Sequence, residues 1–242
     1  MVAQVGSYER KQLLSPSRIV RWSHGRRFEL ARGLVKSLGG RSLIDYGCGD
    51  GMFVKRVHEL VDQCVASDVV PCDLSHIRGV PFVRVDELDE RHAHRYDLVF
   101  CMEVLEHCVA EGVEAVLDDL RRLVAPGGAV VISVPIETGP TLLGKQTVRR
   151  VLGARKVGDY QWTERYGLLQ LMKMVFAREN TAIPRPVHSD GRLKWHTHFG
   201  FNWRALARSI ERRFVVEDLR FTPLGWTREF ASSQAWFVCR PR

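Results

Sequence analysis

Short apolar segments alternate with helical segments through the middle of the chain, and this alternation constrains the fold more than any other feature. Five segments have the length and apolar content of buried strands: residues 42–46, 64–67, 81–85, 96–102 and 129–134. Apolar residues at helical spacing predict helices at 52–60 and 111–124. Strands that alternate with helices form a parallel sheet covered on both faces. We therefore expect an α/β fold with a doubly wound sheet.

The flanking regions extend this pattern. Helices are expected at 17–38, 142–152, 164–178 and 203–213, and strands at 214–221 and 234–239. The last two strands are close in sequence, so we expect them to be antiparallel at the sheet edge. The prediction is one domain in four parts: a helical cap at 1–41, a core at 42–135, a lid insertion at 136–200 and a closing helix and strands at 201–242.

Composition places the chain among ordinary globular proteins, with 45% hydrophobic and 26% charged residues. No apolar run approaches the ~18 residues that a membrane-spanning helix needs. Residues 1–12 lack the apolar core of a signal peptide, so we expect a cytoplasmic location. The six cysteines form no CxxC pair, which is typical of reduced thiols.

The net charge of +8 is unevenly distributed. Residues 1–41 hold nine basic and two acidic residues, whereas residues 42–135 hold eight basic and seventeen acidic residues. Residues 136–242 hold nineteen basic and nine acidic residues. Two interpretations follow: the basic flanks bind an anionic partner, or they are a solvated surface rich in arginine.

A glycine-rich turn at residues 45–51, Asp-Tyr-Gly-Cys-Gly-Asp-Gly, follows the first strand. Glycine lets a backbone approach a ligand closely, and a following helix offers free N–H groups. The GxGxG spacing differs from that of dinucleotide-binding and phosphate-binding loops. Because Asp45 and Asp50 would repel a pyrophosphate, the turn suits a ligand with positive charge.

Two further acidic residues follow neighbouring predicted strands. Asp68 ends the second strand, where a carboxylate can accept hydrogen bonds from both hydroxyls of a ribose. Asp86 is expected to end the third strand and to accept a hydrogen bond from the exocyclic amine of an adenine.

Four segments in order, LIDYGCGDG, the strand-end Asp68, YDLVFCMEVLEH and LVAPGGAVVISVP, resemble the class I S-adenosylmethionine-dependent methyltransferases. The resemblance covers roughly residues 40–135 and, more weakly, 196–242. It implies a seven-stranded sheet whose last strand is antiparallel. It also implies S-adenosylmethionine as the cofactor, a sulfonium ion that suits the acidic core.

The resemblance assigns roles residue by residue. Asp45, Gly47, Cys48 and Gly49 match the loop that contacts the methionine end of the cofactor. The remaining matches are Asp68 to the ribose acid, Asp86 to the adenine-side acid and Met102 to the backbone position beside the cofactor. Methyl transfer needs no covalent enzyme intermediate, so Cys48 is interpreted as a packing residue.

The segment ExxEH allows two interpretations. Glu103, Glu106 and His107 share one helical face and could bind a divalent cation with His196 or His198. This pattern resembles the metal-dependent small-RNA 2′-O-methyltransferases and the ubiquinone-pathway O-methyltransferases, although one residue too many precedes the downstream aromatic. The interpretation favoured here has no metal.

Without a metal, His107 and His198 are the candidate catalytic residues. An imidazole near its ordinary pKa can take a proton from a hydroxyl or an ammonium as the methyl group arrives. We expect the two rings to face the methyl group from opposite walls.

The basic flanks are expected to cover the acceptor. The insertion contributes Lys145, Arg149, Arg150, Arg155, Lys156 and Arg165, with Tyr160, Trp162 and Tyr166 among them. Arginines beside aromatic rings suit phosphate or carboxylate recognition, so the predicted acceptor is a small anionic molecule. Residues 167–176 are apolar nearly all round, which predicts a buried lid helix or, alternatively, peripheral contact with a membrane.

The predicted function is methyl transfer to a small acceptor such as a sugar, a glycan precursor or a secondary metabolite. A metal-assisted RNA 2′-O-methyltransferase is the first alternative, although the chain has no separate RNA-binding module. A catalytically inactive cofactor-binding partner protein is the second alternative.

Overall fold

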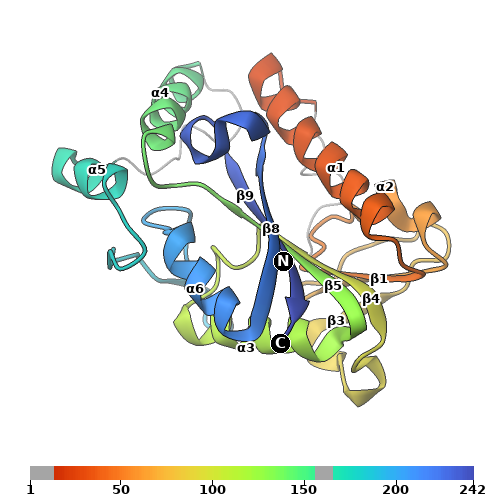
Figure 1. Ribbon diagram of the computed structural model, residues 1–242. Coiled ribbons are helices and arrows are strands. Elements are labelled where there is room, and N and C mark those ends of the chain that lie inside the picture. The colour runs from red at the N-terminus through yellow and green to blue at the C-terminus, as the bar shows by residue number, and fades with distance from the viewer. Residues whose placement is uncertain (1–13, 156–165) are drawn as a thin grey trace.

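A seven-stranded sheet in the order β3-β2-β1-β4-β5-β9-β8 forms the centre of the molecule (Figure 1). The computed structural model describes residues 14–155 and 166–242. The strands are β1 (Ser42–Tyr46), β2 (Gln63–Asp68), β3 (Phe82–Arg84), β4 (Tyr96–Met102), β5 (Val124–Pro135), β8 (Phe214–Thr222) and β9 (Gln234–Pro241). The strand β9 runs opposite to the other six strands and pairs antiparallel with β5 and with β8. The predicted α/β fold with an antiparallel last strand is confirmed.

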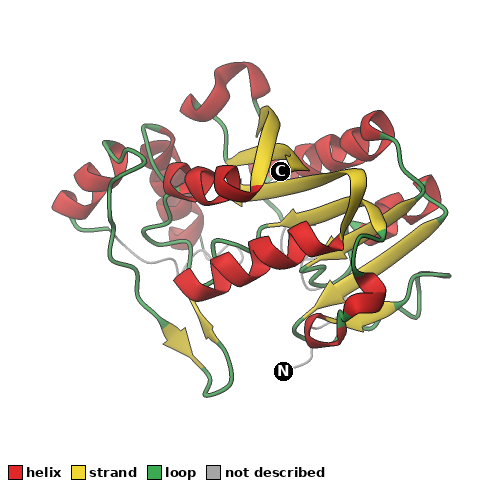
Figure 2. Ribbon diagram, turned by 60° about the horizontal axis from the view of Figure 1, so that its bottom comes forward, coloured by secondary structure: helices red, strands yellow, loops and turns green. Residues whose placement is uncertain are grey.

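Helices cover both faces of the sheet (Figures 1 and 2). One face packs against α1 (Arg18–Leu38) and α2 (Val54–Val57), and the other against α3 (Ala110–Leu123) and α6 (Trp203–Arg213). Each face has its own cluster of buried apolar side chains, so the sheet separates two cores. Near the carboxyl ends of the strands lie α4 (Thr141–Ala154) and α5 (Leu168–Val175).

The helix α1 places a stripe of buried side chains against the sheet and beside the site. Ser17 caps its first turn by accepting a hydrogen bond from the backbone of Val20 at 3.5 Å. Its buried stripe includes Phe28 and Leu34, which pack on the sheet, and Gly39 ends it at a φ of 67°. Arg27 lies in the same buried stripe, so the helix delivers a charged side chain to the interior.

The structure differs from the sequence prediction in four elements. The strand β5 begins at Val124, five residues earlier than expected, because Gly128 lets the chains approach closely: a Cβ there would lie 2.8 Å from the carbonyl oxygen of Asp97. The helix α5 is shorter than predicted, and the expected helix at 52–60 divides into α2 and a 3-10 turn at His58–Leu60. A small hairpin of β6 (His188–Ser189) and β7 (Lys194–Trp195) was missed, since two-residue strands carry no periodicity.

No helix among the described residues is long and apolar enough to cross a membrane.

Candidate active site

Asp45 is the most buried acidic residue of the glycine-rich turn. It is the fourth residue of β1, its exposure is 1%, and neither carboxylate oxygen has a hydrogen-bond partner among the described residues. Burial, and the nearby carboxylate of Asp68, raise the pKa of Asp45 to about 8. A buried acceptor of this kind is stabilised by a ligand that brings a cation with N–H donors.

The backbone after Asp45 turns tightly around an open space. Gly47 has a φ of 83° and lies so close to Val104 that a Cβ would approach its Cγ2 to 2.2 Å. Gly49 has a φ of 56°, and a Cβ added there would meet no atom within 4 Å, so its backbone borders free volume. The side chain of Cys48 is buried, and burial raises the pKa of its thiol, as a packing residue requires.

Asp68 closes the turn from the neighbouring strand. It is the last residue of β2, and its two oxygens accept hydrogen bonds from the backbone N–H groups of Gly49 at 2.9 Å and Val70 at 3.0 Å. A carboxylate oxygen has more than one lone pair, so both oxygens can accept further bonds. This fits the predicted ribose-binding role.

Asp86 does not end a strand, contrary to the sequence prediction. The strand β3 stops at Arg84, and Asp86 lies in the 3-10 turn Val85–Glu87. The guanidinium of Arg84 donates to both of its oxygens, at 2.8 and 2.7 Å, and its side chain is 65% exposed. Met102 is the last residue of β4, as predicted, and packs against the core next to the turn.

These residues fit S-adenosylmethionine at its cationic end. The buried carboxylate of Asp45 matches the ammonium of a methionine group, and the free volume beside Gly49 leaves room for a chain to pass. The predicted cofactor residues Asp45, Gly47, Cys48, Gly49 and Asp68 come together at the carboxyl ends of β1 and β2, where α/β sheets bind ligands.

A cavity of about 840 Å³ adjoins this site. Its walls come from four regions distant in sequence: the first turns of α1, the segment from Pro135 into α4, the segment 195–199 and the loop before β9. Glu103 and His107 are among its lining residues, as are apolar side chains such as Val148 and Phe199. Largely apolar walls with a few polar groups are typical of small-molecule sites.

A buried ion cluster lies in the wall of this cavity. Glu137 is fully buried and accepts from Lys145 at 2.8 Å and, through both oxygens, from Arg149 at 2.8 and 2.6 Å. The two cations lower the pKa of Glu137 to about 2, overcoming the opposite effect of burial. Burial and the neighbouring Arg149 lower the pKa of Lys145, whereas Glu137 and Glu103 raise it. The cluster thus places two basic side chains beside one buried carboxylate in the cavity wall.

His107 and His198 lie side by side rather than on opposite walls. Their ring centroids are 5.0 Å apart. Between them is Glu106, fully buried, whose Oε1 is 3.8 Å from Nε2 of His107 and 3.7 Å from Nε2 of His198. Neither oxygen of Glu106 has a hydrogen-bond partner among the described residues, and burial raises its pKa. Both rings therefore present Nε2 to one small polar space.

Hydrogen bonds fix the tautomer and the position of these rings. Nδ1 of His107 is 2.9 Å from the carbonyl oxygen of His196, which can only accept, so Nδ1 carries the proton and Nε2 of the neutral ring has a free lone pair. Arg185, which the sequence did not single out, donates to the carbonyl oxygens of Glu106, Thr197 and Phe199. It thereby holds the segment that carries His198 against the end of β4.

The sequence suggested Glu103, Glu106 and His107 as metal ligands with His196 or His198, and of these residues the structure groups Glu106, His107 and His198. The potential ligand atoms of Glu106, His107 and His198 lie within 4.8 Å of one another. Glu103 instead turns to Arg27, with an ion pair of 3.3 Å, and Nδ1 of His196 is 2.7 Å from the carbonyl of Pro186. A cation could therefore be held by one carboxylate and two imidazoles.

Two residues of α1 complete the boundary between cofactor turn and cavity. Arg27 is 7% exposed, and its pair with Glu103 fastens α1 to the end of β4. His24 lines the cavity, and burial together with Arg27 and Lys145 lowers its pKa to about 3, so it is neutral near pH 7. No pattern in the sequence around His24 and Arg27 showed that these two side chains point inward.

Of the predicted acceptor-binding side chains, Arg149 is engaged by Glu137 and Tyr166 is buried against Phe199. Arg150 and Arg155 are exposed. Lys156, Tyr160, Trp162 and Arg165 lie outside the described residues.

Comparisons with known proteins agree with this geometry. A family model described as a methyltransferase domain matches residues 21–179. A ubiquinone biosynthesis O-methyltransferase of Bordetella avium is 31% identical over 52% of this chain and 57% of its own length. A second such enzyme, of Proteus mirabilis, is 29% identical over 40% of this chain and 42% of its own length. The chain thus spans about half the length of the curated relatives it matches.

Solved structures show the same fold. A protein of Pyrococcus horikoshii aligns with a TM-score of 0.56 at 14% identity, covering 97% of this chain and 98% of its own. The 1,6-didemethyltoxoflavin-N1-methyltransferase of Burkholderia thailandensis, solved with S-adenosylhomocysteine, aligns with a TM-score of 0.54 at 17% identity, covering 100% and 92%. The chain therefore belongs to the methyltransferase domain family and is, in sequence family and fold, a class I S-adenosylmethionine-dependent methyltransferase.

Proposed function

We propose that this chain transfers a methyl group from S-adenosylmethionine to a hydroxyl of a small acceptor that carries an anionic group, with a histidine as general base. The observation that carries the proposal is the position of His107 and His198, which both line the cavity and whose Nε2 atoms both lie near Oε1 of Glu106. The two curated relatives described above are named as O-methyltransferases, and this supports an oxygen acceptor.

The cofactor supplies an electrophilic methyl group. Asp45 would bind its ammonium group, Asp68 would accept from its ribose hydroxyls, and the backbone of Gly47 and Gly49 would leave room for its methionine chain. In-line transfer needs little beyond alignment and proximity, and these residues would supply the alignment.

The base acts on the acceptor hydroxyl. His107 presents a free lone pair at Nε2, and His198 is kept neutral because burial and the nearby cations lower its pKa to about 3. A ring with a pKa of about 3 is a weak base near pH 7, so His107 is the better candidate to accept the hydroxyl proton as the new bond to oxygen forms, with His198 beside it. The carboxyl group of Glu106 lies between the two rings, and burial raises its pKa.

The buried cations support an anionic acceptor. Lys145 and Arg149 both contact the single buried carboxylate of Glu137, and both line the cavity. These two basic side chains would attract a phosphate or carboxylate of the acceptor. A phosphorylated or nucleotide-linked sugar, or an acidic secondary metabolite, has this chemistry.

Methyl-labelled cofactor tests the proposal directly. The purified chain is incubated with phosphorylated sugars, nucleotide-linked sugars and neutral hydroxyl compounds of similar size. We expect label to move to an anionic hydroxyl acceptor and salt to raise its apparent KM. Binding of the cofactor in calorimetry without transfer to any acceptor would instead indicate an inactive cofactor-binding protein.

A second candidate function is metal-assisted transfer to a ribose 2′-hydroxyl of RNA. The observation that favours it is the cluster of Glu106, His107 and His198, in which a fully buried carboxylate lies between two imidazoles. Titration of the intact protein with Mg²⁺, Mn²⁺ and Zn²⁺ in calorimetry distinguishes the two. Tight binding of one cation, lost in Glu106→Gln, together with label transfer to small RNA, would replace the general-base proposal.

A further inference from the structure

The helix α5 presents an apolar face to solvent. Leu168, Leu169, Met172 and Phe176 are 76%, 87%, 47% and 70% exposed, and their spacing places them on one side of the helix. Met174 is fully buried on the other side. The prediction of a buried lid helix therefore holds only for the face that carries Met174. The opposite face is apolar and exposed to solvent.

The exposed apolar side chains continue along the mouth of the cavity. Ile19 and Trp22 of α1 and Phe230 of the turn Gly225–Phe230 line the cavity, and are still 61%, 46% and 63% exposed. Trp226 of the same turn is 85% exposed. The first turns of α1, this turn, α4 and α5 lie along one side of the molecule (Figure 1). We call these four elements the rim.

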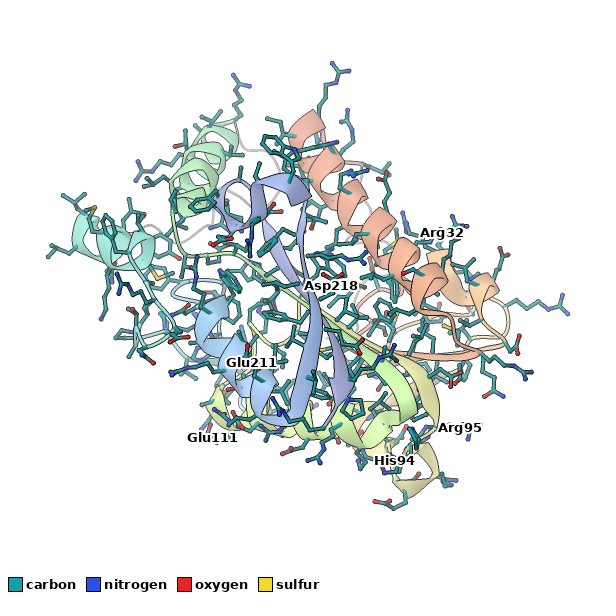
Figure 3. The ribbon with its side chains drawn as sticks, in the orientation of Figure 1. Arg32, His94, Arg95, Glu111, Glu211 and Asp218 are labelled. Atoms are coloured by element: carbon teal, nitrogen blue, oxygen red, sulfur yellow. The ribbon has the colours of Figure 1, made fainter. Side chains whose placement is uncertain are left out.

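The accessible charge on the rim is mostly positive. Arg18 of α1, Arg150 of α4 and Lys173 of α5 are exposed, and neither α4 nor α5 contains an acidic residue. Other basic side chains of the rim are engaged within the protein: Lys145 and Arg149 by Glu137, Arg27 by Glu103 and Arg26 by Glu29. At the opposite end, Glu111 on α3 lies far from α4 (Figure 3), and Arg213 of α6 is paired with Glu114 and Asp118 of α3.

We infer that the rim docks on the surface of an anionic lipid bilayer. Exposed leucine, methionine and aromatic side chains, together with exposed basic side chains, are the two features that bind a protein in the plane of such a surface. No helix of the described residues could span the bilayer, so the contact is peripheral. The cavity mouth then opens toward the lipid. This inference goes beyond the proposed function and does not depend on it.

Flotation with lipid vesicles tests the inference without any methyl transfer. We expect the intact chain to bind vesicles of phosphatidylcholine mixed with phosphatidylglycerol, and to bind pure phosphatidylcholine vesicles about tenfold more weakly. Added salt should weaken binding to the anionic vesicles. The double variant Leu169→Gln and Phe176→Gln should lose binding about tenfold, since both side chains are already exposed and the fold keeps its core.

Val215→Gln is the matched control, because Val215 is an exposed apolar residue at the start of β8, outside the rim. It should bind vesicles as the intact chain does. Failure of the intact chain to bind anionic vesicles would overturn the inference. So would a dimer in sedimentation velocity that the double variant dissociates, because a second copy of the chain would then cover the face.

Discussion

On the cofactor side of the site, Asp45 and Asp68 stand at the ends of neighbouring parallel strands, within one stretch of acidic sequence. On the acceptor side, the cavity walls come from α1, α4, the segment 195–199 and the loop before β9, which are distant in sequence. The difference teaches how each side obtains its geometry. The cofactor turn is set by strand ends and local glycines, whereas the acceptor cavity depends on long-range contacts that bring separate segments together.

The largest expected effect lies where the two sides meet. His107→Ala or His198→Ala, whichever removes the base, should lower turnover by ~10²–10⁴ and leave cofactor affinity unchanged. Single-turnover kinetics and calorimetry measure the two quantities. The exposed His76, changed to alanine, is the control.

Full turnover in both histidine variants would show that alignment alone carries the reaction. Loss of turnover with EDTA, and its recovery with a divalent cation, would assign both rings with Glu106 to a metal instead.

A second prediction concerns the charge of Asp45. Its pKa of about 8 lies above the ordinary 3.8, so without cofactor the carboxyl is largely protonated at neutral pH. Binding the cofactor's cation requires the ionised form and releases a proton. Cofactor affinity should therefore rise with pH, by up to about tenfold per unit, and level off above pH ~8. Calorimetry in buffers of different ionisation enthalpy measures the released proton.

Asp45→Asn is the matched variant for this prediction. It should bind the cofactor about 10- to 100-fold more weakly, as expected for loss of a ~1.5–3 kcal/mol hydrogen bond to a charged group, with little pH dependence. The free folded state holds a proton that the unfolded state releases above pH ~3.8, so the stability of the intact chain falls as pH rises toward 8. The variant should lack this loss. Equal pH profiles of affinity for both proteins would contradict the assignment.

The difference between the two sides also explains how much the sequence could predict. Asp45, Gly47 and Asp68 follow from a glycine turn and a strand end, because parallel strands bring their carboxyl ends to one edge. Asp86 was placed wrongly, since β3 is only three residues long and its end has no clear sequence signal. Short strands leave such positions undetermined.

The acceptor side was less predictable. The guanidinium of Arg185 donates a hydrogen bond to the carbonyl oxygen of Glu106, which lies 79 residues earlier in the sequence. Glu137 accepts hydrogen bonds from Lys145 and Arg149 of the next helix. No periodicity or motif marks such pairs. The histidines were found through a family resemblance, but their side-by-side arrangement depends on these contacts.

A third prediction tests whether the acceptor side depends on such a contact. Arg185→Met should lower kcat about tenfold and change KM for the acceptor little, because the segment with His198 loses three carbonyl contacts while the cavity walls remain. Cofactor affinity should stay unchanged. Arg192→Met, in the exposed hairpin between β6 and β7, is the control. An unchanged kcat with an intact fold would show that His198 is positioned by other contacts.

The smallest expected effect separates two adjacent arginines of α4. Arg150 is exposed, so Arg150→Ala should raise the acceptor KM only a few-fold and change the free energy of unfolding by less than ~0.5 kcal/mol. Arg149→Ala removes one of two cations from the buried Glu137, so it should also destabilise the fold, by less than the ~3–5 kcal/mol of a fully broken buried pair because Lys145 remains. Denaturant unfolding of both variants measures the change in the free energy of unfolding, and steady-state kinetics measures the change in the acceptor KM. If Arg149→Ala raised KM without loss of stability, Glu137 would be held by Lys145 alone, and Arg149 would be free to bind the acceptor.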